Sequence, residues 1–117
     1  MKDKHGSLES EILNAIWHLE ETANGDELYI SVNRIFQILN ENNSSRAYTT
    51  IKTVMDRLVE KGLLERTKTG KKFCYTSVST RNEMAKEAIQ KLARQYFRND
   101  MKLMMKAIEK ESLHYVY

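Results

Sequence analysis

Hydrophobic residues recur at helical spacing in three segments of this chain. In residues 8–19, 32–39 and 51–58 they lie three and four positions apart, which places them on one face of an α-helix. The apolar positions are Leu8, Ile12, Ile16, Trp17, Leu19, Val32, Ile35, Phe36, Leu39, Ile51, Val54, Met55 and Leu58. The pattern therefore predicts three amphipathic helices, and Trp17 is expected in the core.

Capping and turn-forming residues separate these helices. Ser7 and Ser31 stand where an N-cap is expected, because a serine hydroxyl can accept a hydrogen bond from a free N–H group of the first turn. Residues 24–26 (NGD) and 40–45 (NENNSS) are clusters of turn formers. The third helix begins near Ala47, after the second of these clusters.

The spacing changes after the third helix, which is expected to end at Lys61-Gly62. Residues 64–67 and 73–76 are strand-forming runs, and the five residues between them suit a basic hairpin tip. Residues 28–30 (LYI) could add an edge strand to this hairpin. Two helices joined by a polar turn and followed by a hairpin predict a winged helix-turn-helix, mostly α with a small β-sheet. We expect it to occupy residues 1–78.

A second helical region is expected over residues 79–117. Apolar residues recur at helical spacing from Met84 to Tyr96, a break is expected at residues 98–100, and the spacing then resumes. The winged helix is complete without these helices, so their apolar faces need another surface, and a partner subunit is the first expectation. The expected dimerisation residues are Ile89, Leu92, Tyr96, Met101, Met104, Met105 and Ile108. The alternative is that these faces fold back on the first helix.

The charge of the chain is unevenly distributed. Residues 1–43 hold three cations and eight acids (net −5), residues 44–76 hold eight cations and three acids (net +5), and the remainder holds eight and five (net +3). A basic stretch is often only a solvated surface. Here the cations coincide with a predicted helix and hairpin, which favours double-stranded DNA as the partner.

Composition limits the other functions. The chain of 117 residues has one cysteine, Cys74, and no proline, and its three histidines are scattered, so no zinc site or nucleophile with its base is recognisable. We expect no cofactor and no enzymatic activity. Asp56 and Glu60 lie one helical turn apart, and a solvated or ion-paired role is expected for them. The lone cysteine, with no membrane span or signal peptide, predicts a cytoplasmic protein.

The DNA contacts can be assigned from position along the third helix. Its N-terminal half should reach base edges, and the hairpin should lie near the phosphates. Expected base contacts are Tyr48, Thr49, Lys52 and Thr53; expected phosphate contacts are Arg46, Thr50 and Arg57, with Lys68, Lys71 and Lys72 on the hairpin. Packing against the preceding helix is an equal alternative for Tyr48.

Three segments carry a resemblance to a known family: residues 47–51 (AYTTI), 56–58 (DRL) and 61–64 (KGLL), with Tyr75 closing the hairpin. Together with the order of elements, they resemble the penicillinase-repressor family of bacterial winged-helix repressors. The resemblance implies a homodimeric repressor that binds an inverted-repeat operator and is released by a signal.

This sequence departs from the family at the residues that respond to the signal. Resistance regulators of the family are inactivated by proteolysis at an Asn-Phe bond in the C-terminal helices, whereas Asn99 here is followed by Asp100. Copper-responsive relatives carry a C-terminal cysteine cluster, which this chain lacks. The resemblance therefore predicts a repressor but not its inducer, and any sensor or protease partner stays unidentified.

Two other functional classes fit the same pattern. A winged helix can serve as a protein-interaction module whose basic surface docks on an acidic partner, with only weak and unselective affinity for DNA. A regulator can also bind a small ligand between the DNA-binding module and the C-terminal helices. Binding to duplex DNA at several salt concentrations distinguishes the first alternative from a sequence-specific repressor.

Overall fold

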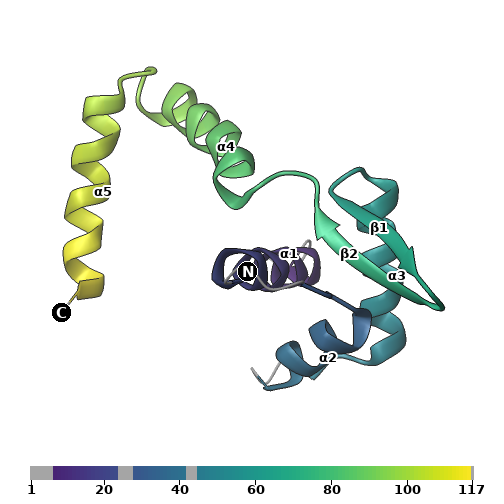
Figure 1. Ribbon diagram of the computed structural model, residues 1–117. Helices are drawn as coiled ribbons and strands as arrows, with labels where there is room; N and C mark the ends of the chain where they lie inside the picture. Colours follow the sequence, from purple (N-terminus) through teal and green to yellow (C-terminus); the bar gives the residue numbers. More distant parts are fainter. Residues whose placement is uncertain (1–6, 24–27, 42–44, 117) are drawn as a thin grey trace. The chain divides into compact units, whose positions relative to one another are not determined.

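The computed structural model describes residues 7–23, 28–41 and 45–116 (Figure 1). The elements are α1 (Ser7–Thr22), α2 (Val32–Glu41), α3 (Tyr48–Glu60), β1 (Leu64–Thr69), β2 (Lys72–Ser77), α4 (Arg81–Tyr96) and α5 (Met101–Val116). They form two compact units, residues 1–80 and 81–117. Five helices with one two-stranded antiparallel sheet confirm the predicted fold class among the described residues.

Helix α1 is longer at its C-terminal end than the hydrophobic spacing predicts. The apolar pattern stops at Leu19, but the helix continues to Thr22. The carboxylate of Glu20 accepts hydrogen bonds from the backbone N–H of Ser77 at 2.9 Å and from its hydroxyl at 2.6 Å. These contacts hold the last turn of α1 against β2. Ser7 is the first residue of α1, and its side chain lies outside the described residues, as does the expected turn at 24–26.

Helix α2 begins as predicted. The hydroxyl of Ser31 accepts a hydrogen bond from the backbone N–H of Arg34 at 3.1 Å, so Ser31 caps the helix. The edge strand expected at residues 28–30 is not formed. A hydrogen bond from the Tyr75 N–H to the Ile30 carbonyl at 2.8 Å joins this segment to β2, but the sheet has two strands, β1 and β2. Residues 42–44 of the following connection lie outside the described part of the chain.

Helix α3 ends at a glycine in the left-handed conformation, as predicted. Gly62 has φ +79°, its N–H donates to the carbonyl of Val59, and the N–H of Leu63 donates to the carbonyl of Leu58. This pair of bonds is the Schellman motif, which satisfies carbonyls that the helix itself leaves unpaired. The chain then turns directly into β1.

The hairpin has longer strands and a tighter turn than predicted. Thr69 pairs with Lys72, which leaves a two-residue turn at Gly70 and Lys71 in place of the expected five-residue tip. Gly70 has φ +66°, a conformation that glycine adopts without strain. Lys68, Thr69 and Lys72 are exposed, and the backbone pairing of the two strands continues through them.

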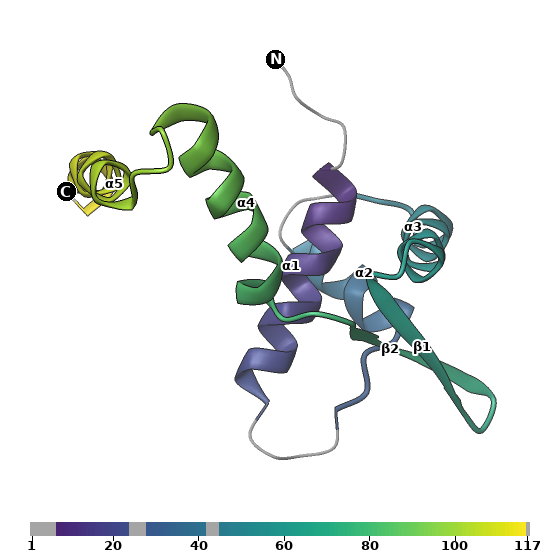
Figure 2. The same ribbon diagram turned by 90° about the horizontal axis from the view of Figure 1, so that it is seen from above.

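The first unit has one continuous core. Helices α1, α2 and α3 pack against one another, β1 packs on α3, and β2 packs on α1, as Figures 1 and 2 show from two directions. Ile12, Ile16, Ile35, Met55 and Leu58 are fully buried at its centre. The indole N–H of Trp17 donates to the carbonyl of Ser79 at 2.9 Å, so the core position expected for Trp17 is correct and its polar atom is satisfied.

The second unit is a helical corner. Helix α4 ends at a turn in which Arg98 and Asn99 both have positive φ, and the carboxylate of Asp100 accepts a hydrogen bond from the N–H of Leu103 to cap α5. The predicted break at residues 98–100 is therefore present. Ala93 and Met104 are buried within this unit, and most of its other large apolar side chains are exposed.

Candidate nucleic-acid interface

Helix α3 has two faces of opposite character. Its buried face carries four apolar side chains that belong to the core of the first unit: Ile51, Val54, Met55 and Leu58. The polar residues proposed from the sequence for DNA contact are exposed: Thr49, Thr50, Lys52, Thr53 and Arg57. A helix held by one face and presenting hydroxyl and cationic groups on the other has the form needed to enter the major groove.

The start of α3 is fixed by contacts with the two preceding helices. The ring of Tyr48 meets that of Phe36 edge to face, with ring centroids 5.7 Å apart, so the packing alternative for Tyr48 is realised. Tyr48 nevertheless keeps 42% of its surface exposed. Arg46 pairs with Glu11 of α1 at 3.1 Å. An Arg46 contact with phosphate would therefore exchange or share this ion pair.

A second ion pair lies at the other end of α3. The ammonium of Lys61 contacts the carboxylate of Glu9 on α1 at 2.7 Å. Glu9 and Glu11 thus each hold a cation that flanks α3, one beyond its C-terminus and one before its N-terminus. Because both pairs are partly exposed, each contributes about 1 kcal/mol or less to stability. Their effect is to orient the helix and to neutralise part of the acidic charge of α1.

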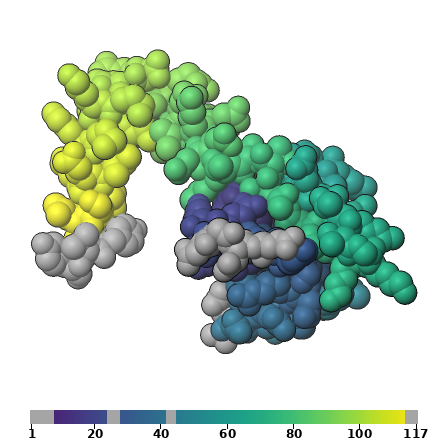
Figure 3. All heavy atoms as spheres, viewed as in Figure 1, coloured from purple at the N-terminus to yellow at the C-terminus, as the bar shows by residue number. Residues whose placement is uncertain are grey.

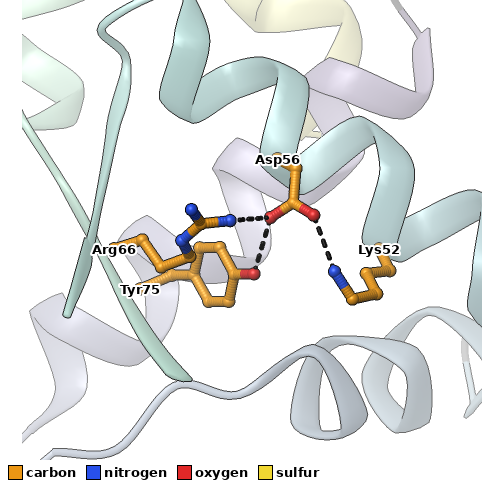
Figure 4. A network of polar contacts seen from close by, with 4 residues as sticks. All are labelled: Lys52, Asp56, Arg66 and Tyr75. Carbon is orange, nitrogen blue, oxygen red and sulfur yellow. Dashed lines mark hydrogen bonds and ion pairs between the residues drawn. The ribbon is translucent and has the colours of Figure 1, made fainter. Parts of the chain in front are cut away.

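The most connected polar group of the interface is the carboxylate of Asp56 on α3 (Figure 4). Its Oδ2 atom accepts from the Lys52 ammonium at 2.7 Å. Its Oδ1 atom accepts from the Arg66 guanidinium at 3.0 Å and from the Tyr75 hydroxyl at 2.8 Å. Arg66 belongs to β1 and Tyr75 to β2, where the two residues are directly paired. One carboxylate therefore links α3 to both strands of the hairpin. The ion-paired role expected for Asp56 is present, although its partners are Lys52 and Arg66 and lie partly in the hairpin.

The protonation equilibria follow from this network. Burial acts to raise the pKa of Asp56, but the hydrogen bonds from Lys52, Tyr75 and Arg66 outweigh it and lower the pKa below its ordinary value. Burial and the hydrogen bond to Asp56 raise the pKa of Tyr75 to about 12. The bond to Asp56 also raises the pKa of Arg66. At neutral pH the network consists of one anion, two cations and one neutral hydroxyl.

The hairpin tip carries exposed basic side chains. Lys68, Lys71 and Lys72 are all exposed, and Figure 3 shows the tip projecting from the first unit. The ring of exposed Phe73 lies under two cations, with the Arg66 guanidinium 4.8 Å and the Lys68 ammonium 5.7 Å from its centroid. Such cation–π contacts restrict both side chains to one face of the hairpin.

Sequence reasoning did not assign Arg66, Phe73 or Tyr75 to this surface, and it did not expect Asp56 to contact the hairpin. Arg66 and Lys68 are two residues apart in one strand, and Phe73 and Tyr75 are two residues apart in the other. This spacing could have placed all four side chains on one face of the hairpin. Which helix that face meets depends on tertiary packing. The residues predicted for DNA contact on α3 and at the hairpin tip are exposed, and the contacts of Asp56 with the hairpin were missed.

A second exposed surface lies on α4 and α5. Six of the seven residues expected to mediate dimerisation are exposed: Ile89, Leu92, Tyr96, Met101, Met105 and Ile108. Met104 differs, because it is only 2% exposed and packs within the second unit. Leu92, Phe97, Met104 and Ile108 line a shallow apolar groove between α4 and α5. Met104 thus belongs to the floor of this surface.

The described residues contain no group of three or more His, Cys, Asp or Glu side chains placed to hold a metal ion. No helix in the described ranges is long and apolar enough to cross a membrane. Cys74 is half-buried on β2.

Comparison with known proteins identifies the family. A search of curated proteins found no significant match to this chain. The family model described as "Penicillinase repressor" matches residues 5–115, nearly the whole sequence. The fold agrees with this match, since the structure combines a mostly helical chain with one small antiparallel sheet. The chain belongs to the penicillinase repressor family of DNA-binding transcriptional regulators.

Proposed function

We propose that this protein is a homodimeric transcriptional repressor that reads an inverted-repeat operator with α3 and the β1–β2 hairpin. In this proposal the winged helix predicted at residues 1–78 binds DNA and residues 79–117 pair two subunits. The compact units of the structure divide two residues later, at 80/81. Repression follows because a dimer bound at a promoter obstructs RNA polymerase.

The observation that carries the proposal is the outer face of α3. Thr49 and Thr53 are exposed on the face opposite the core, so both can approach base edges without any change in the fold. A threonine can hydrogen-bond to a base through its hydroxyl and contact the thymine methyl group through its own methyl. Arg57 is also exposed, near the other end of the helix, where contact with phosphate is expected.

The hairpin supports the same orientation. Lys68, Lys71 and Lys72 project cationic groups at its tip, and among the described residues neither Lys71 nor Lys72 forms an ion pair. Their charge is available to DNA phosphates, and each contact formed would release condensed counterions. These contacts set affinity and position, whereas the threonines of α3 set sequence preference.

The second unit supports a two-fold dimer. Its exposed apolar residues on α4 and α5 form a surface that water solvates poorly and that a second copy can cover with the same residues. A two-fold pair presents two copies of α3 to the DNA. The operator should therefore be an inverted repeat whose half-sites are separated by about one helical turn, or by a multiple of it.

Selection of bound sequences from a random duplex pool tests the proposal directly. We expect an inverted repeat to be enriched and bound with a steep dependence on salt, and we expect sedimentation equilibrium to give a dimer. Weak, unselective binding would contradict the assignment of α3 to base recognition. A selective monomer that enriches a single half-site would contradict the role given to the second unit.

A further inference from the structure

The carboxylate of Asp56 occupies an unusual place for a DNA-binding surface. It lies on the recognition helix, among residues expected near a polyanion, and its side chain is 29% exposed. A carboxylate beside phosphates is unfavourable unless cations neutralise it. Here Lys52 and Arg66 supply that neutralisation, and the Tyr75 hydroxyl adds a third hydrogen bond.

The three donors differ in their freedom to move. Tyr75 is 1% exposed, so its ring is fixed in the core and its hydroxyl cannot reach DNA. Arg66 is held on one side by Asp56 and on the other by the ring of Phe73. Lys52 has one short contact with Asp56, one helical turn away, and its side chain is 48% exposed. Lys52 is therefore the donor that can also bond to a base, because its ammonium has three N–H groups and only one is needed for the contact with Asp56.

We propose that Asp56 is a positioning residue for operator recognition: it holds Lys52 toward the base edges and fixes the hairpin against α3 through Arg66 and Tyr75. This inference rests on the proposed function, since it assumes that α3 reads DNA. Asp56 itself makes no base contact in this arrangement. When a second N–H group of Lys52 bonds to a base, the carboxylate keeps its ion pairs with Lys52 and Arg66 and its hydrogen bond from Tyr75.

The alternative is that Asp56 only stabilises the folded unit. In that case the substituted protein would be folded in a smaller fraction of molecules. Its apparent affinity for every duplex would fall by the same factor, and its sequence preference would not change. A positioning role predicts a change in base preference. Without Asp56 the Lys52 side chain samples more rotamers, so it loses more conformational entropy when it binds one base. Base discrimination is therefore the measurement that separates the two roles.

The test uses Asp56→Asn with Glu60→Gln as the matched control. Both substitutions keep the side-chain size, remove one negative charge and lie on α3, but no hydrogen bond joins Glu60 to the hairpin among the described residues. The probes are the duplex that the wild-type protein enriches from a random pool, a scrambled duplex of the same composition, and single-base variants of the enriched duplex. Circular dichroism confirms that each variant is folded at the assay temperature.

We expect Asp56→Asn to reduce the ratio of affinities for the enriched and scrambled duplexes by about tenfold, and Glu60→Gln to leave this ratio unchanged. The Lys52→Ala variant should already have lost the same base preference, so adding Asp56→Asn to it should change that preference little. Equal ratios for Asp56→Asn and Glu60→Gln would overturn the inference.

Tyr75→Phe provides a second test that does not depend on the folding of the Asn variant. It removes only the hydroxyl that reaches Asp56 and keeps the buried ring. We expect the affinity ratio to fall by about threefold or more; an unchanged ratio would overturn the link between the hairpin and base reading. If the wild-type protein enriched no duplex sequence at all, the proposed function would fail first, and the inference would fall with it.

Discussion

The two units differ in how far they bury their large apolar side chains: most are buried in residues 1–80, and most are exposed in residues 81–117. In the first unit three helices and a hairpin bury them around a common centre, and Ile12, Ile35 and Leu58 are fully buried. In the second unit Leu92 and Ile108 are among several large apolar residues that stay exposed, and Ala93 and Met104 are the buried hydrophobic residues of its described part. The first unit can therefore fold around its own core, whereas the second leaves most of its large apolar side chains exposed, and these include most of the residues assigned to the proposed dimer.

The largest expected effect comes from breaking the apolar surface of the second unit. Leu92→Asp places a charge on a side chain that is 43% exposed in one chain and that the proposed dimer would bury. We expect monomers by sedimentation equilibrium and a loss of operator affinity of about 10²- to 10⁴-fold, because two linked half-sites no longer act together. Gln90→Asp, at an exposed polar position of α4, makes the same charge change and should remain dimeric. A dimeric Leu92→Asp variant would remove the basis for assigning pairing to this surface.

The next effect tests the core of the first unit. Leu58→Ala removes a fully buried side chain of α3 and should lower the free energy of unfolding by about 2–5 kcal/mol. Val78→Ala, at an exposed position, should change it by about 0.5 kcal/mol or less. Trp17 is the only tryptophan and lies in this core, so its fluorescence during urea unfolding reports on the first unit. Similar losses for the two variants would contradict the contrast between the units.

Alkaline titration examines how the hairpin is held to α3. The pKa of Tyr75 is raised from 10.0 to about 12, so the folded state favours its protonated form. The stabilisation from this group is complete below pH 10 and is lost as the pH rises toward 12. We expect the Tyr75→Phe variant to lose less stability than the wild-type protein between pH 10 and 12, as measured by urea unfolding at each pH. Parallel stability curves for the two proteins would show that the hydroxyl is not linked to folding.

Base reading by the outer face of α3 should respond to a smaller change. Thr53→Ala removes a hydroxyl and a methyl group from an exposed position, so the fold should be unaffected. We expect discrimination at one base position in each half-site to fall by about 1 kcal/mol, measured by competition between single-base variants of the operator. Equal weakening on operator and random DNA would refute a base contact by Thr53.

The smallest effect is expected at the hairpin tip. Lys71→Ala should weaken binding to all sequences by about threefold and lower the slope of affinity against salt concentration by about one unit on logarithmic axes. The same should hold for Lys72→Ala. A change in sequence preference without a change in slope would mean that the tip reads bases.

Much of the first unit was predictable because its signals are local. Hydrophobic spacing located α2 and α3, Ser31 marked the start of one helix, and Gly62 marked the end of the other. The extra turn of α1 was not predictable in this way, since Glu20 is held by Ser77, far along the chain. Lysine and threonine at the hairpin tip suggested a loop, although backbone pairing continues through them.

The candidate site was predictable in its surface but not in its internal contacts. An exposed polar face is the complement of a buried apolar one, so Thr49 and Thr53 followed from the helical period. The contacts of Asp56 with Arg66 and Tyr75 depend on how the hairpin packs against α3, which no spacing along the sequence encodes. For the same reason, the burial of Met104 within its own unit could not be distinguished from exposure at an interface.

The division of α3 into a face that supports the fold and a face that is open to water has an evolutionary consequence. In the proposed function, mutations at Thr49 or Thr53 would alter the genes that the regulator controls without loss of the folded protein, so duplicated copies would acquire new targets through single substitutions. The positioning role proposed for Asp56 would constrain this divergence, because one mutation there would disturb both the choice of target and the packing of the hairpin against α3.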